Sequence, residues 1–227
     1  MLSLAGAALL AIPSSANAAT PQVTIKVTHR YVVDYVGRCL PADWEVDWMG
    51  EGTGVSKVVM NDINPAGKIK YTETAKPGET RGYGWGCVSS DEYGKWTARV
   101  TAYDRSGHVL ARRSDWYMHR GNTQITSFNA SPEPIRAGRT LTVAGRLLHV
   151  KFGSAPGYGS YAGKTIRVYF KAAGSKTWKW MGSTTTGRDG RFRRHFTARH
   201  DGTWRAIFPG TSHYDGETSP GDYVDVR

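Results

Sequence analysis

The sequence predicts an all-β protein of two sandwich domains in tandem after a signal peptide. The chain has 227 residues, enough for two domains of about 100 residues each. It combines 27 glycines with 8 Trp and 12 Tyr, a composition typical of many short strands joined by turns. Apolar residues recur with a period of two, and the mature chain has no pattern of an amphipathic helix of normal length.

Residues 1–18 are interpreted as the signal peptide. A short apolar run, Leu4 to Ile12, precedes the small-x-small sequence Ala16-Asn17-Ala18, which is typical of a secretory cleavage site. No Lys or Arg precedes the apolar run, so we expect the start codon to lie upstream. The alternative is an apolar tail on a cytosolic protein. We expect export, with the mature protein released or held by non-covalent contacts, because no later segment is long and apolar enough to span a membrane.

The mature chain contains two cysteines, Cys39 and Cys87. In an exported protein an even number of cysteines favours a disulfide, so we expect these two to form one. In the chain-entropy model this cross-link stabilises the fold by about 4 kcal/mol. The alternative is two buried thiols. Neither cysteine has the paired spacing that a zinc site requires.

A domain boundary is expected between Gly121 and Asn122, giving domains 19–121 and 122–227. The first has 14 basic and 12 acidic residues, whereas the second has 16 and 7. The segment from Asn129 to Pro134 contains two prolines two residues apart, so it must form an edge or a connection.

Alternation places the expected strands of the first domain. Apolar residues alternate with polar ones in residues 23–28, 44–48 and 96–103. The sequence Asp104-Arg105-Ser106-Gly107 is typical of a hairpin turn, and residues 108–117 are the expected returning strand.

The second domain shows seven short strand patterns, expected at residues 123–128, 140–143, 166–170, 177–181, 191–196, 204–208 and 223–226. Gly187-Arg188-Asp189-Gly190 is an expected turn. Seven strands in about 105 residues are typical of an immunoglobulin-like sandwich.

The second domain also resembles a repeated immunoglobulin-like domain of secreted actinobacterial proteins, mainly from streptomycetes. The residues that carry the resemblance, over about 122–227, are Ser127 to Gly138, Leu141 to Leu147, Tyr161 to Lys164, Val168 to Lys171, Asp201 to Arg205, Phe208 to Gly210 and Gly221 to Val226. The resemblance implies export, a β-sandwich and an extracellular or cell-wall setting. It implies no catalytic activity and no defined site residues.

The sequence contains no recognisable catalytic or cofactor motif. Its seven histidines are scattered, and both Gly-x-Ser-x-Gly and His-Glu-x-x-His are absent. The oxygen-bearing segments at residues 61–64 and 222–225 lack the carboxylate density of a calcium site. We therefore expect no enzyme, no cofactor, no catalytic residue and no metal.

Two candidate binding surfaces remain. The first is a basic run that adjacent strands align, comprising Lys176, Lys179, Arg188, Arg191, Arg193 and Arg194. Anionic wall polymers are its expected partner through screened Coulomb attraction, while export argues against nucleic acid. The alternative interpretation is a solvated face that keeps the protein soluble.

The second candidate surface consists of aromatic residues suited to stacking on glycans, namely Trp85, Trp178, Tyr158 and Tyr161. The alternative places Trp178 and Trp180 in the core, because they share one strand face. The sequence thus favours a non-enzymatic secreted or wall-associated protein for binding or spacing. There are two alternatives: a carbohydrate-binding module protein, and a secreted inhibitor that acts through the loop between Val150 and Lys164.

Overall fold

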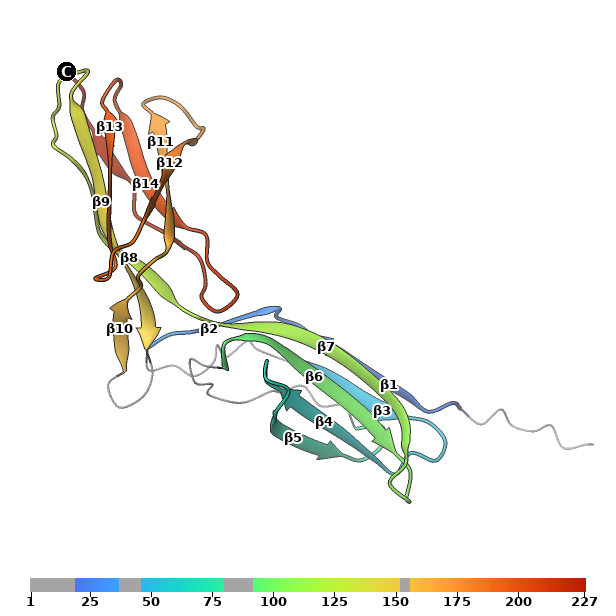
Figure 1. Cartoon of the computed structure of the whole chain (residues 1–227). Helices are drawn as coiled ribbons and strands as arrows, with labels where there is room; N and C mark the ends of the chain where they lie inside the picture. Colours follow the sequence, from blue (N-terminus) through green and yellow to red (C-terminus); the bar gives the residue numbers. More distant parts are fainter. Residues whose placement is uncertain (1–18, 37–45, 80–91, 152–155) are drawn as a thin grey trace, which may run out of the picture.

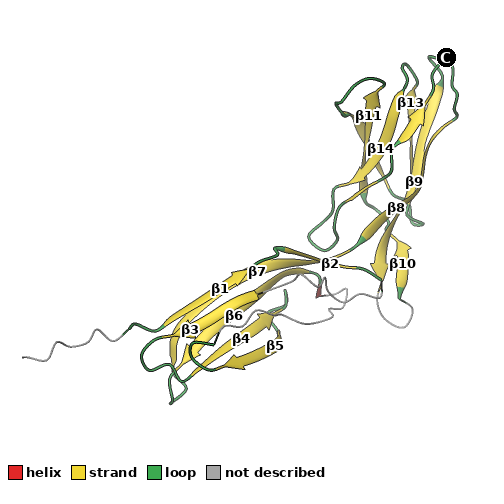
Figure 2. Cartoon of the chain, turned by 180° about the vertical axis from the view of Figure 1, so that it is seen from behind, coloured by secondary structure: helices red, strands yellow, loops and turns green. Residues whose placement is uncertain are grey.

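A computed structural model describes residues 19–36, 46–79, 92–151 and 156–227 (Figures 1 and 2). These residues form strands, turns and loops with no α-helix, so the predicted fold class of β-sandwiches in tandem is confirmed. The signal peptide, both cysteines and Trp85 lie outside the described residues, and the predictions made on them stay predictions.

Among the described residues, seven strands precede Asn122: β1 (Gln22–Val27), β2 (Tyr31–Asp34), β3 (Val46–Glu51), β4 (Lys57–Ile63), β5 (Ile69–Ala75), β6 (Gly94–Tyr103) and β7 (Val109–Gly121). Five of them form one sheet in the order β2-β7-β6-β4-β5, and β1 pairs with β3 in a second sheet. All pairs are antiparallel except β2 with β7. The predicted alternation is confirmed in β1, β3 and β6, where alternate residues are buried.

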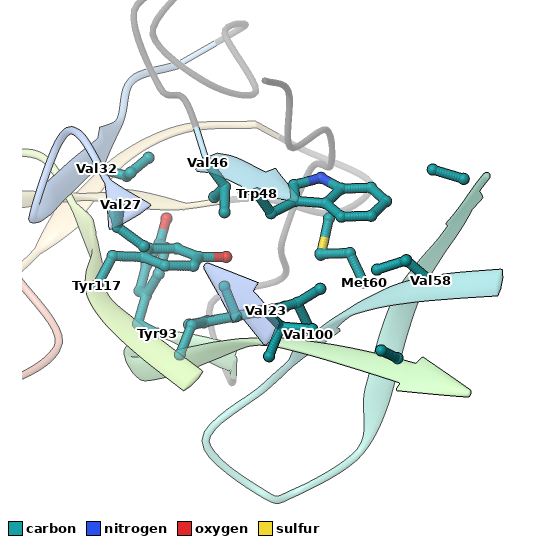
Figure 3. Close-up of a cluster of buried hydrophobic side chains, with 14 of the residues drawn as sticks. Val23, Val27, Val32, Val46, Trp48, Val58, Met60, Tyr93, Val100 and Tyr117 are labelled. Carbon is teal, nitrogen blue, oxygen red and sulfur yellow. The ribbon is translucent and has the colours of Figure 1, made fainter. Parts of the chain in front are cut away.

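The core of this first sandwich lies between the two sheets (Figure 3). Trp48 from β3 and Met60 from β4 are almost wholly buried there, among valines of β1, β3, β4 and β6. A polar pair lies in this interior, where the hydroxyl of Tyr117 donates a hydrogen bond of 2.8 Å to Oδ2 of Asp62. Burial raises the pKa of the Asp62 carboxyl to about 6, against the opposing hydrogen bonds from Tyr117 and the backbone of Ile63.

In the part of the second sandwich that the structure describes, nine strands follow Asn122: β8 (Thr123–Ser131), β9 (Thr140–Lys151), β10 (Gly157–Ser160), β11 (Thr165–Ala172), β12 (Lys179–Thr185), β13 (Arg191–Thr197), β14 (Gly202–Phe208), β15 (Glu217–Thr218) and β16 (Asp222–Val224). One sheet contains β8, β9, β10 and β13, and the other contains β11, β12, β14, β15 and β16. Leu141, Val143, Ile166, Val168 and Trp204 fill the space between them. In Figure 1 the two sheets face each other, and β12 and β13 are edge strands.

The two sandwiches meet at a joint with defined contacts. Strand β7 ends at Gly121 and β8 begins at Thr123, so a single residue connects them. The backbone of Gly121 exchanges hydrogen bonds of 2.9 Å with His213 and Asp215 of the second sandwich. Tyr93 and Tyr214 meet edge to face, with ring centroids 5.5 Å apart. Buried rings and backbone hydrogen bonds therefore connect the sandwiches.

Gly121 is required at the joint because neighbouring side chains leave no room for a Cβ. A Cβ there would lie 2.6 Å from Cε2 of Tyr93 and 2.9 Å from both Tyr214 and Val150. We expect Gly121→Ala to destabilise the chain by about 1–3 kcal/mol through overpacking. Thermal unfolding checks this, with Gly157→Ala as the control because a Cβ at Gly157 meets nothing within 4 Å. Equal melting temperatures for the two variants would contradict the prediction.

Candidate functional site

The basic residues predicted as one patch lie at two ends of the second sandwich. Arg188 lies in the turn between β12 and β13, and Arg191 and Arg193 are exposed at the start of β13. Lys176 and Lys179 are exposed at the opposite end, in the β11–β12 loop and at the first residue of β12. A strand of seven residues separates the two groups by roughly 20 Å. These residues therefore do not form the single continuous patch that the sequence predicts.

The prediction also places Arg194 in the exposed patch, but its side chain points toward the interior between Phe192 and Phe196. Its partner in the register of β13 with β9 is the fully buried Val143. The guanidinium crosses the open side of the sandwich and donates a hydrogen bond from Nη1 to the carbonyl of Ser183 on β12. Gly182 makes this crossing possible, because a Cβ there would lie 2.6 Å from Cζ of Arg194. Arg194 thus closes the edge between β12 and β13.

Three arginines gather on the outer side of β9 and β13, and we call them the arginine face: Arg146, Arg191 and Arg193. Arg191 lies directly opposite Arg146 in the register of the two strands, and Arg193 lies opposite Ala144. Arg146 and Arg191 flank a shallow cavity of about 720 Å³. The lining residues are Thr126, Ser127, Ala144, Gly145, Arg146, Thr184, Thr185, Gly187, Arg191, Phe192 and Arg193.

The arginine face has more positive charge than its neighbours neutralise. Arg146 donates hydrogen bonds to the carbonyl of Asp189 and to Oγ of Ser160, at 2.8 and 2.9 Å. Arg191 lies 3.6 Å from the exposed carboxylate of Asp189. No Asp or Glu lines the cavity within the described part of the chain. Like charges directly opposite each other across two strands destabilise a sheet, so an anion in this cavity relieves a repulsion that the fold contains.

Ser127 adds a second unusual feature to the same cavity. It has φ of 51°, the one positive value found for a non-glycine residue among the described residues. It lies where the register of β8 against β9 shifts between Thr126 and Asn129. Bulges and left-handed residues of this kind concentrate at functional sites. The hydroxyl groups of Thr126, Ser127 and Thr184 accompany the arginines in the lining.

Sequence reasoning missed Arg146 and Ser127. The alternation of Val143, Gly145 and Leu147 places Arg146 on the outer face, but not beside Arg191. That juxtaposition depends on the pairing of β9 with β13, which are about 45 residues apart. Ser127 carries no sequence signal of its bulge.

A second cavity, the tip groove, opens between the far ends of β12 and β13 and measures about 840 Å³. Its lining includes Phe170, Phe196 and Trp204. The ring centroids of Phe170 and Phe196 lie 4.9 and 4.7 Å, respectively, from that of Trp204. Lys179 and Arg199 lie on its rim. The prediction that Trp178 and Trp180 are core residues is wrong, since Trp180 is 60% exposed and Trp178 is only half-buried.

Tyr158 and Tyr161, predicted to stack on glycans from a loop, are half-buried near the joint instead. The hydroxyl of Tyr158 donates a hydrogen bond of 2.7 Å to Oδ1 of Asn122. Tyr161 packs against the rings of His149 and Tyr214, at 4.9 and 4.8 Å between centroids. Their rings are therefore engaged in intramolecular packing. Strand β10 likewise pairs residues 157–160 with β9, so this part of the loop suggested for an inhibitor forms a hairpin.

Within the described ranges, no group of three or more His, Cys, Asp or Glu side chains is placed to hold a metal ion. The described residues also include no helix with the length and apolar character needed to cross a membrane.

Comparison with known proteins identifies no family. No protein-family model and no curated protein matches the chain. Similar solved structures include a tetra-tandem repeat in the extending region of a large adhesion protein, with 14% identity, a TM-score of 0.35 and coverage of 89% of this chain and 48% of that one. This chain therefore spans about half the length of that structure.

Two further similar structures are modular β proteins. The fibronectin(III)-like modules of Clostridium thermocellum CbhA share 16% identity at a TM-score of 0.33, covering 91% of this chain and 94% of that one. A bacterial ice-binding adhesin of 1.5 MDa shares 14% identity at a TM-score of 0.31, covering 92% and 66%. At these scores the similar structures carry no argument about the function of this chain.

Proposed function

We propose that this chain is a non-enzymatic extracellular protein whose second sandwich binds an anionic cell-wall polymer through the arginine face. The observation that carries the proposal is the direct opposition of Arg146 and Arg191 across β9 and β13, beside a cavity without a lining carboxylate. The first sandwich, connected at the joint, supports and spaces the binding domain. The setting at the wall follows from the expected signal peptide and the resemblance to secreted actinobacterial domains.

The chemistry of the face suits phosphate or carboxylate groups. A guanidinium binds such groups through two parallel hydrogen bonds. The second domain, with 16 basic and 7 acidic residues, also attracts anionic polymers at longer range. Because both interactions are electrostatic, binding should weaken as salt shortens the Debye length.

The test is retention on purified Gram-positive cell walls. Wild-type protein should be retained at about 0.01 M salt and released at about 1 M, where the Debye length falls from about 30 to about 3 Å. The double variant Arg191→Gln/Arg193→Gln should lose most of the low-salt retention. Arg112→Gln/Arg113→Gln is the matched control, since it removes the same charge from exposed positions on β7.

Two outcomes would overturn this function. One is equal retention of wild-type protein in low and high salt. The other is equal loss in both double variants, which would mean that net charge, and not the arginine face, attracts the polymer.

A further inference from the structure

The outer face of the sheet opposite the arginine face displays a row of aromatic and cationic side chains. On β11, Tyr169 lies directly between Trp180 of β12 and Arg205 of β14 in the sheet register. Neighbouring strands lie about 4.8 Å apart, so these three side chains form a continuous row across three strands. Tyr223 of β16 lies on the same side, opposite Thr203. In Figure 1, β11 and β12 lie on the side of the sandwich away from β9.

Two of these rings are exposed to an extent that folding does not require. Trp180 is 60% exposed and Tyr223 is 50% exposed. Nothing in the core depends on either ring, because neither belongs to a buried cluster of the second sandwich. Contiguous exposed apolar surface of this kind marks an interaction site.

Cationic groups hold the adjacent rings in place. The guanidinium of Arg205 lies 3.9 Å from the ring centroid of Trp178 and 5.8 Å from that of Tyr169. Lys171 lies 5.1 Å from the ring of Trp178. Such cation–π contacts orient the rings before any ligand arrives. We call Tyr169, Trp178, Trp180 and Tyr223 the aromatic platform.

The charge on this face is of one sign. Arg167, Lys171 and Arg205 lie on the outer side of β11 and β14, and none of them forms an ion pair or a hydrogen bond within the described residues. The single acidic residue in β11, β12, β14 and β16 is Asp222, which accepts a hydrogen bond from the backbone of Ala130. The cations of this face therefore lack an anionic partner in this part of the protein.

We propose that the aromatic platform binds a linear polysaccharide that carries carboxylates. The C–H face of a pyranose ring packs on the electron-rich face of an indole or phenol ring, as on Trp180 and Tyr169. Carboxylates along the same chain pair with Arg205 and Lys171 through charge-assisted hydrogen bonds. This second site is on the opposite sheet from the arginine face and does not depend on it.

The test is calorimetric titration of the full chain with polygalacturonate and with neutral galactan. Wild-type protein should bind polygalacturonate more tightly than galactan, and Trp180→Ala should weaken the binding of polygalacturonate by about tenfold, the effect of about 1.4 kcal/mol of stacking. Trp180→Phe should retain most of the affinity, because it keeps an aromatic face. Trp116→Ala is the matched control: Trp116 is an exposed tryptophan of the first sandwich that lies beneath two cations, Arg30 and Lys95, as Trp178 of the platform lies beneath Arg205 and Lys171.

The arginine face also suits carboxylates, so the titration is repeated in the Arg191→Gln/Arg193→Gln background. The tenfold loss caused by Trp180→Ala should persist there, which separates this site from the arginine face. The proposal is overturned if wild-type protein does not bind polygalacturonate, if Trp180→Ala binds as wild type does, or if Trp116→Ala weakens binding as strongly. Equal affinity for galactan overturns the assignment of an anionic polymer.

Discussion

Replacing His119 with Ala should destabilise the first sandwich by about 3–5 kcal/mol, the cost of removing one partner of a buried polar pair that contains a carboxyl group. Nε2 of His119 lies 2.9 Å from Oδ1 of Asp34, and each side chain is only 1% exposed. The charge of the Asp34 carboxylate also acts on the nearby hydroxyl of Tyr93. Without the imidazole, a buried carboxylate loses a close polar partner. The shift in the denaturant midpoint, followed by tryptophan fluorescence, measures the effect.

The chain contains a matched control for this substitution. His108 and Asp104 form a second His–Asp pair, at 3.1 Å, but with the His108 side chain 80% exposed. Water solvates both groups there, so His108→Ala should leave the midpoint unchanged. An unchanged midpoint in His119→Ala would show that the buried pair contributes nothing to stability.

The pair also matters for the joint between the sandwiches. His119 lies two residues before Gly121, and its ring is 5.9 Å from that of Tyr93, which in turn contacts Tyr214. Burial, followed by the charge of Asp34, raises the pKa of the Tyr93 hydroxyl well above its usual range. The phenol therefore stays neutral. The buried His119–Asp34 pair thus lies beside a ring that contacts the second sandwich.

Local alternation was enough to predict the fold class. In β1, Val23 and Val27 are buried and Thr24 is exposed, and in β3 Trp48 lies between two more exposed residues. Such patterns need no knowledge of the partner strand, because the side-chain period of two is a property of a single strand. The same period of two places Arg194 on the strand face of Phe192 and Phe196. The structure explains this by placing β13 at an edge, where a guanidinium reaches across to β12.

The candidate sites were harder to predict because they depend on contacts between distant strands. Nothing near Arg191 in sequence indicates that Arg146 lies opposite it, and nothing near Tyr161 indicates that it packs against Tyr214. The exposure of Trp180 has a similar origin. The register of β12 shifts against β11 between Val168 and Tyr169, so Met181 packs into the core while Trp180 turns outward. A bulge reverses the face of each residue beyond it, and the alternation of Trp178 and Trp180 gives no sign of it.

The stability of the first sandwich should depend on pH through Asp62. This carboxyl is 4% exposed, and burial raises its pKa from 3.8 to about 6. Below pH 3.8 the group is protonated in both the folded and the unfolded chain, so it adds no pH dependence. Between the two pKa values the folded chain retains a proton that the unfolded chain has released, and stability falls as pH rises. Above the folded pKa, the buried charge costs about 3 kcal/mol, since one pKa unit corresponds to about 1.4 kcal/mol.

Asp62→Asn removes this titration while keeping an oxygen to accept the hydrogen bond from Tyr117. The free energy of unfolding of the variant, relative to wild type, should therefore rise by about 3 kcal/mol between about pH 4 and pH 8. Using the difference at two pH values cancels any fixed cost of burying the amide, because that cost is the same at both. Asp47→Asn, at an exposed position of β3, should show no such rise. A constant difference between Asp62→Asn and wild type would mean that the carboxyl reaches solvent or a cation in the folded protein, and that its burial in the core does not set its pKa.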